Sequence, residues 1–195
     1  MAVSAATYER VALEDPDSKW EMVCGRLRRK PTMTYEHNDL AFELAHVIRS
    51  QVDPRAFRIR CDQARVRAAG SYFIPGVFVV PVTLTQALRG HPETLEVYAE
   101  PLPLVVEVWS RSTGEYDVNE KLAEYRRRGD GEIWLVHPYE RTLTAWRRQT
   151  DGSYQETIWE RGKLQASTLP GVTIDLEELF GASQSDMGAF GATCS

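Results

Sequence analysis

One carboxylate interrupts the most apolar run of the sequence. Glu107 lies in the segment 104–109, whose other members are leucine, valine and tryptophan. A charged side chain in a buried strand is costly unless an opposite charge or a hydrogen bond pairs with it. We therefore expect Glu107 either to form a structural ion pair, with Lys121 or an arginine, or to belong to a functional site.

Other kinds of site are disfavoured because the sequence lacks the residue patterns that they would need. The three cysteines, Cys24, Cys61 and Cys194, are scattered and form no CxxC pair, so neither a structural zinc site nor a disulfide framework is indicated. Ser110 and Ser112 have no histidine–aspartate set around them in the sequence, which argues against a serine hydrolase.

Basic residues recur in short runs that could contact a phosphate backbone. Arg58 with Arg60, and Arg65 with Arg67, are the candidate nucleic-acid contacts, although most such runs are only solvated faces. The sequence contains no helix-turn-helix, zinc finger or stacking platform that would define a sequence reader. The net charge of −5 disfavours weak, sequence-independent adhesion to DNA without excluding a local basic patch.

The segments around Glu107 predict how it is positioned. An apolar strand over 104–109, a helix over 117–128 that ends at Gly129, and a second apolar strand over 133–136 follow one another with short connections. Such a unit predicts a right-handed crossover with parallel pairing of the two strands. Both faces of the first strand should be covered by other elements.

Upstream of this unit, the sequence predicts a hairpin, a helix and several strands. Trp20–Val23 and Arg26–Arg29 should pair as a hairpin, and apolar residues recur at helical spacing over 37–49. The segments 57–60 and 65–67 alternate apolar and basic residues, which predicts a half-buried strand pair. The expected fold class is α/β (α+β), a mixed β-sheet flanked by helices with an extra amino-terminal hairpin.

Length and composition bound the organisation of the chain. The 195 residues suit a single domain, expected over 1–180, and a tail over 181–195 that is small, polar and expected to be disordered. The amino terminus lacks the layout of a signal peptide, and no apolar run is long enough to span a bilayer. We therefore expect a cytoplasmic protein without a membrane partner.

Four stretches of the sequence resemble the motifs of one protein family. They are Trp20–Leu27, similar to "YELIDGEL"; Leu104–Thr113, similar to "LVVEVLSPST"; Tyr116–Tyr125, similar to "YDRGEKLALY"; and Ile133–Pro138, similar to "YWLVDP". The family is the Uma family of restriction endonucleases, within the PD-(D/E)XK restriction-endonuclease-like superfamily. The resemblance covers most of residues 8–180, and its middle block is the specific part.

The resemblance implies a restriction-endonuclease-like core and an endonuclease, a hydrolase that cleaves DNA phosphodiester bonds with Mg²⁺ or Mn²⁺ as cofactor. It makes Glu107 a catalytic, metal-binding carboxylate. It gives Lys121 the task of orienting or helping to deprotonate the attacking water, because Trp109 occupies the superfamily's usual lysine position. Glu21 would add a metal ligand from the hairpin. DNA and a second copy of the chain, in a homodimer, are the expected partners.

The chain departs from the family at Gly76, which stands where the family has the metal-binding aspartate of its "PDV" motif. Glycine supplies no ligand, and Asp62 and Glu93, the carboxylates on either side of it, are distant in sequence. Three interpretations stay open: an inactive relative without a cofactor, an enzyme that recruits Glu21 or Glu36, or an active variant. The alternative functions are a non-catalytic DNA- or protein-binding member of the same fold and a homodimeric interaction protein.

Overall fold

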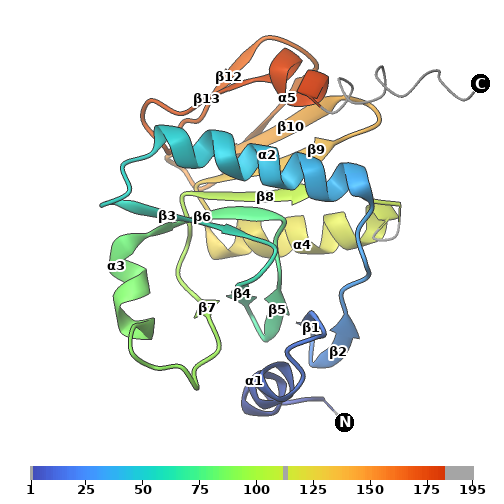
Figure 1. The fold of residues 1–195 in the computed structure, drawn as a ribbon, viewed down its shortest axis with the longest axis vertical. Helices are drawn as coiled ribbons and strands as arrows, with labels where there is room; N and C mark the ends of the chain where they lie inside the picture. Colours follow the sequence, from blue (N-terminus) through green and yellow to red (C-terminus); the bar gives the residue numbers. More distant parts are fainter. Residues whose placement is uncertain (1, 112–113, 183–195) are drawn as a thin grey trace, which may run out of the picture.

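The computed structural model describes residues 2–111 and 114–182, apart from the side chains of 114–118 and 182. Figure 1 shows the arrangement of its helices and sheets. The helices are α1 (Ala5–Glu14), α2 (Tyr35–Gln51), α3 (Val82–Thr85), a 3₁₀ turn (Gln86–Leu88), α4 (Gly114–Arg128) and α5 (Leu176–Ala182). The strands are β1 (Trp20–Val23), β2 (Arg26–Arg29), β3 (Phe57–Cys61), β4 (Arg65–Ala68), β5 (Ser71–Phe73), β6 (Val77–Pro81), β7 (Val97–Tyr98), β8 (Leu104–Val108), β9 (Glu132–His137), β10 (Thr142–Arg148), β11 (Tyr154–Trp159), β12 (Lys163–Gln165) and β13 (Thr173–Asp175).

A six-stranded sheet of order β11-β10-β9-β8-β6-β3 forms the centre of the molecule. Strand β8 pairs in parallel with β9 and antiparallel with β6. Leu104, Val106 and Val108 of β8 face one core and Val105 faces the other, because successive side chains of a strand point to opposite sides. The parallel strand–helix–strand unit predicted from the sequence is confirmed.

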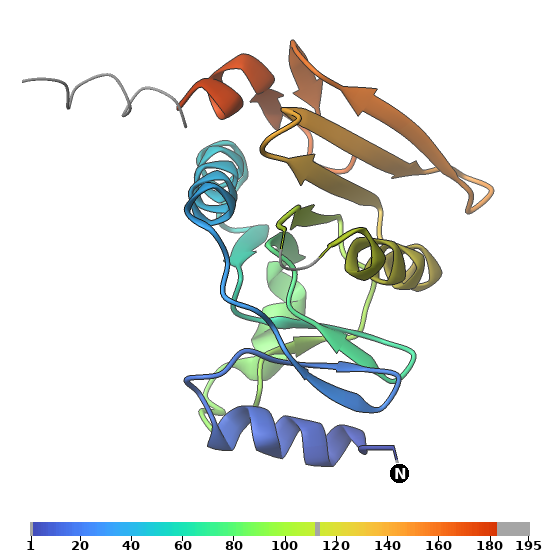
Figure 2. The same ribbon diagram turned by 90° about the vertical axis from the view of Figure 1, so that its right-hand side faces the viewer.

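Helices cover both faces of this sheet, α2 on one side and α4 on the other (Figure 2). The buried residues of α2 recur at the spacing of a single helix face: His37, Leu40, Ala41, Leu44 and Ile48. Thr34 caps the helix, because its side chain accepts a hydrogen bond from the backbone N–H of His37. Coverage on both sides is the reason why β8 is apolar except at Glu107.

A second sheet, of order β2-β1-β5-β4-β7, lies at the amino-terminal end of the molecule, where α1 packs against it. The chain crosses between the two sheets twice in succession, after β3 and before β6. The two crossings lie side by side, since the backbone N–H of Asp62 donates to the carbonyl oxygen of Gly76 at 3.0 Å. The candidate site is built at this junction.

The structure contradicts the predicted pairing of segments 57–60 and 65–67. Strand β3 pairs with β6 in the larger sheet, whereas β4 pairs with β5 and β7 in the smaller one. Asp62 lies between the two segments with a φ of 53°, in the left-handed region, and turns the chain out of the larger sheet. Alternation therefore identified both strands correctly but could not identify their partners.

The boundaries of several elements also differ from the prediction. The apolar run over 73–80 is divided between the two sheets at Pro75 and Gly76, where proline cannot continue the strand pairing. Helix α5 extends to Ala182, so the first two residues of the predicted tail are helical, and the remainder lies outside the described residues. The single domain over 1–180 stays a prediction.

Among the helices that the structure describes, none is both long and apolar enough to cross a membrane.

Candidate functional site

Glu107 and helix α4 meet on the face of the central sheet that α4 covers. The Tyr125 hydroxyl donates a hydrogen bond to Oε1 of Glu107 at 2.6 Å, and Nζ of Lys121 lies 3.6 Å from the same oxygen. Lys121 and Tyr125 are four residues apart on α4, so their side chains lie one above the other on a single helix face. The helix thereby delivers two donors to one buried carboxylate.

Glu21 reaches the same lysine from the smaller sheet. Nζ of Lys121 lies 2.9 Å from Oε1 of Glu21, and the backbone N–H of Ile74 donates to that oxygen at 2.8 Å. The pairing of β1 with β5 brings Glu21 beside the crossing that contains Ile74. The residues of this cluster are nearly inaccessible, with exposed fractions of 1% for Glu21, 3% for Lys121 and 8% for Glu107.

The two carboxylates are electrostatically different although they share one lysine. Burial tends to raise the pKa of Glu21, but the ammonium groups of Lys121 and Lys30 outweigh it and the pKa is lowered. At Glu107 burial prevails over the same two ammonium groups, and its pKa is raised. Burial and the neighbouring Glu107 carboxylate raise the pKa of Tyr125, which keeps its hydroxyl protonated as a hydrogen-bond donor.

Gly76, which the resemblance places at the family's aspartate position, lies against β8 beside the two residues that flank Glu107. A Cβ on Gly76 would lie 3.4 Å from the carbonyl oxygen of Val106 and 3.5 Å from the amide nitrogen of Val108, the two residues that flank Glu107. The register of β6 and β8 agrees, since Val77 is opposite Val106. A side chain at position 76 would therefore start in ordinary van der Waals contact with the backbone of β8 on either side of Glu107 and with the side chain of Val108, 3.6 Å away.

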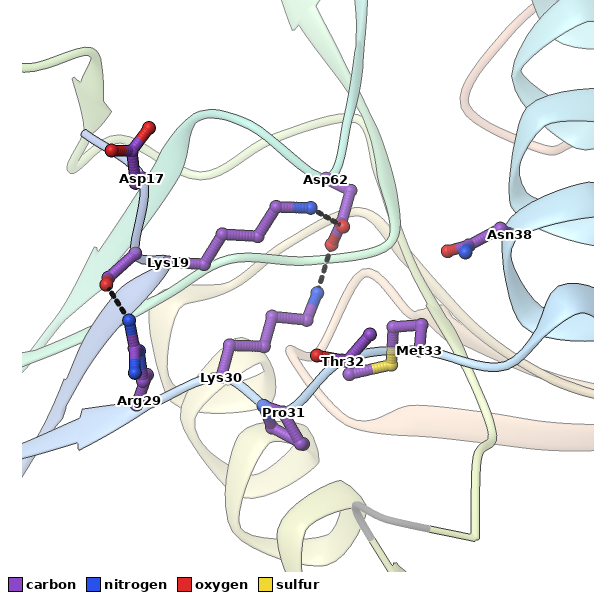
Figure 3. Close-up of a pocket in the computed structure, with 10 residues that line it drawn as sticks. Asp17, Lys19, Arg29, Lys30, Pro31, Thr32, Met33, Asn38 and Asp62 are labelled. Atoms are coloured by element: carbon purple, nitrogen blue, oxygen red, sulfur yellow. Dashed lines mark hydrogen bonds and ion pairs between the residues drawn. The ribbon is translucent and has the colours of Figure 1, made fainter.

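Asp62 lies at the same junction, although it is 14 positions from Gly76 in the sequence. It follows β3, directly beside Gly76, and its carboxylate is paired with Lys30 and Lys19 (Figure 3). Lys30 also donates to the carbonyl oxygen of Ile74 at 2.9 Å. Burial tends to raise the pKa of Asp62, but the two lysines lower it overall. Asp62, Lys19 and Lys30 line a cavity of about 530 Å³.

His37 of α2 is buried beside this network without a hydrogen-bond partner for its Nδ1 atom. Burial and the ammonium of Lys30 lower the pKa of His37 from 6.5 to about 4. The ammonium of Lys121 also lowers it, whereas the carboxylate of Asp62 opposes the shift. The imidazole is therefore neutral near pH 7. Nothing in the sequence distinguished His37 from an ordinary core histidine.

The four candidate arginines are divided between the two sheets. Arg58 and Arg60 line a cavity of about 330 Å³ beside β3, where Nε of Arg60 lies 2.5 Å from Oε1 of Glu96. Arg65 and Arg67 lie on β4 of the smaller sheet. Contact of either pair with nucleic acid stays a prediction.

The family model Uma2, described as "Putative restriction endonuclease", matches residues 5–177. The chain belongs to the Uma2 family. A solved structure from Anabaena variabilis, described as a "putative nuclease belonging to DUF820", is similar with a TM-score of 0.71 and 19% sequence identity. The similarity covers 85% of this chain and 91% of that one, and at this identity it shows the fold alone. No curated protein sequence matches the chain.

Membership of the Uma2 family confirms the resemblance seen in the sequence, and the nuclease-like fold confirms the expected fold class. The structure brings together Glu21, Glu107 and Lys121, with Gly76 beside them. Glu36 is instead at the start of α2, where the Tyr139 hydroxyl donates to it at 3.3 Å. The correspondence of Gly76 to the metal-binding aspartate of the Uma2 family stays a prediction.

Three buried groups of the site and the half-buried Asp62 were not recognised from the sequence. Tyr125 had the spacing of a core residue, Lys30 ended a basic run, Asp62 was too distant along the chain, and His37 was a lone histidine. Only Tyr125 carried a usable signal, since it lies one helical turn after Lys121.

The carboxylate oxygens of Glu21 and Glu107 are the type of ligand that a magnesium ion prefers. Such ions prefer hard oxygen ligands and are usually held by one or two carboxylates with several waters, and Glu21 and Glu107 supply two. In the described part of the chain, no group of three or more histidine, cysteine, aspartate or glutamate side chains could hold a metal ion. A cation would also compete with the ammonium of Lys121 for the same carboxylates.

Proposed function

We propose that this protein is a nuclease that hydrolyses phosphodiester bonds in DNA with a divalent metal cofactor, and that Glu21, Glu107 and Lys121 form its active site. The observation that carries the proposal is the contact of Nζ of Lys121 with both carboxylates, at 2.9 and 3.6 Å. Three separate elements, β1, β8 and α4, supply these residues. Membership of a restriction-endonuclease family supports the reaction class.

The proposed roles follow from charge and position. Glu21 and Glu107 are fixed oxygen donors, held by the N–H of Ile74 and the hydroxyl of Tyr125, and would hold a magnesium or manganese ion. Such an ion supplies neutralisation of phosphate charge and a more acidic water. Lys121 presents N–H donors at the same place and can orient the attacking water or a phosphate oxygen.

A plasmid-nicking assay with Mg²⁺ or Mn²⁺ tests the proposal. We expect slow nicking by the wild-type protein, because Gly76 removes one ligand, and no nicking by Glu107→Gln, which keeps the side-chain shape and removes the charge. Lys163→Met, at an exposed lysine of β12, is the matched control and should nick like the wild type. Nicking that persists unchanged in Glu107→Gln would refute the assignment.

One observation favours a second candidate function, a nucleic-acid-binding protein that has lost cleavage. The junction holds three carboxylates and three lysines: Glu21, Glu107, Asp62, Lys19, Lys30 and Lys121. Their charges balance without an added cation. DNA binding without metal-stimulated nicking would favour this candidate over the enzyme. The homodimer and the cytoplasmic location also stay predictions, and light scattering tests the first.

A further inference from the structure

Another cavity, of about 520 Å³, opens just beyond the end of β8. The residues that line it are Trp109, Arg111, His137, Tyr139 and Glu140. Three of these five are aromatic, and Tyr139 is 55% exposed. One exposed and two half-buried aromatic rings thus gather beside an exposed arginine, and such a group is unusual on a surface that has only to be solvated.

The aromatic rings of this cavity form an ordered stack. The rings of Trp109 and His137 have centroids 4.3 Å apart and are inclined by 27°, and the ring of Tyr139 meets Trp109 edge-on at 5.8 Å. Backbone contacts hold the stack in place. The N–H of Trp109 donates to the carbonyl oxygen of Val136 at 2.8 Å, and Nδ1 of His137 accepts from the N–H of Glu140 at 3.0 Å.

The Trp109–His137 pair continues the strand register that carries the candidate active site, whereas the Tyr139 hydroxyl reaches Glu36 at the start of α2. Trp109 follows Glu107 by two residues, and the hydrogen bond of Trp109 to Val136 extends the parallel ladder of β8 and β9. Two residues along a strand span about 7 Å and point to the same face. His137 has the same relation to Leu135, which is the partner of Glu107. A single nucleotide can bridge this separation.

We infer that this cavity binds an unpaired nucleobase, and that the substrate is therefore single-stranded or locally unpaired DNA. This inference rests on the proposed function, because it takes the scissile phosphate to lie at Glu107. Base–aromatic stacking contributes about 1–3 kcal/mol per base and tolerates any sequence. A base within a duplex is already stacked on both sides and cannot offer its face to Tyr139 and Trp109.

The two charged residues of the cavity fit the same ligand. Arg111 is exposed and can contact a phosphate of the bound strand. The carboxylate of Glu140 repels phosphates, but it is 70% exposed at the side chain and lies 3.8 Å from Nε2 of His137. A carboxylate can also accept a hydrogen bond from the amino group of a base. The cavity therefore matches a nucleotide better than a bare phosphate.

Fluorescence anisotropy of a labelled oligodeoxythymidylate tests the inference. The titration uses the full chain in EDTA, so that binding is measured without cleavage. We expect Tyr139→Ala and Trp109→Leu each to weaken binding by about fivefold or more, the loss of one stacked base. Phe42→Ala, which removes an aromatic side chain that is 66% exposed on α2, is the matched control and should leave the affinity unchanged. A blunt duplex should bind Tyr139→Ala and wild-type protein equally.

Each result has a definite meaning. The inference would be overturned if the oligonucleotide bound Tyr139→Ala, Trp109→Leu and the wild-type protein with equal affinity. It would also be overturned if the wild type did not bind the oligonucleotide. Equal weakening of single-stranded and duplex DNA would also overturn it, because base stacking requires an unpaired base. Loss of nicking in Glu107→Gln is scored separately. Tyr139-dependent binding without any nicking would refute the proposed enzyme but keep the base site.

Discussion

Replacing Lys121 with methionine removes a charge that two buried carboxylates share, while nearly preserving the side-chain volume. The side chains are 4% exposed at Lys121, 1% at Glu21 and 11% at Glu107, so water cannot replace the ammonium. Removing one partner of a buried ion pair costs about 3–5 kcal/mol. We expect the free energy of unfolding to fall by that amount, because Lys30, the other buried ammonium nearby, is paired with Asp62.

Urea unfolding followed by circular dichroism, without divalent ions, measures this loss. With a slope of roughly 2 kcal/mol per molar urea, a loss of about 4 kcal/mol lowers the midpoint by about 2 M. Lys163→Met is the control, since the Lys163 side chain is 71% exposed and lies 3.3 Å from the half-buried Asp175. An exposed pair contributes only about 0–1 kcal/mol, so its midpoint should hardly change. A Lys121→Met midpoint like that of the control would refute the structural role of the lysine.

The same variant tests whether the carboxylates bind metal. An ion that binds only the folded state at a hundred times its dissociation constant stabilises it by about 2.7 kcal/mol. Mg²⁺ should stabilise Lys121→Met at least as much as the wild type, because the competing ammonium is gone. If Mg²⁺ stabilises neither protein, Glu21 and Glu107 do not form a metal site.

Three further predictions concern the neighbours of this cluster. Gly76→Asp should tighten Mg²⁺ binding by about tenfold or more, measured by calorimetry, because the added carboxylate would start beside Glu107; unchanged affinity would place the missing ligand elsewhere. Since the pKa of His37 falls from 6.5 to about 4 on folding, the unfolded chain binds the extra proton and stability decreases as the pH falls through this window. The decrease should reach roughly 2 kcal/mol at pH 5, and urea unfolding of His37→Gln should lack this part of the pH dependence. Tyr125→Phe should lose about 1–3 kcal/mol of stability, seen in the same unfolding assay, because it removes the 2.6 Å hydrogen bond to the buried Glu107.

Much of the local structure could be predicted from the sequence. Residue periodicity identified the amino-terminal hairpin, the long helix that starts after Thr34, and the apolar strands around Glu107 and Trp134. These signals are local, because a strand or helix face repeats every two or 3.6 residues. The family resemblance singled out Glu21, Glu107 and Lys121 before their contacts were known. Those contacts join residues from three elements, and no spacing along the chain encodes them.

The tertiary structure alone decided which strands pair and which polar groups meet. Asp62 and Gly76 are 14 positions apart in the sequence but share a backbone hydrogen bond, because both lie where the chain crosses between the sheets. The stack of Trp109 and His137 likewise required β8 and β9 to be adjacent and parallel, which is why the sequence showed no stacking platform. Periodicity reports which face of an element is buried, whereas the neighbours of that face depend on how the whole chain closes on itself.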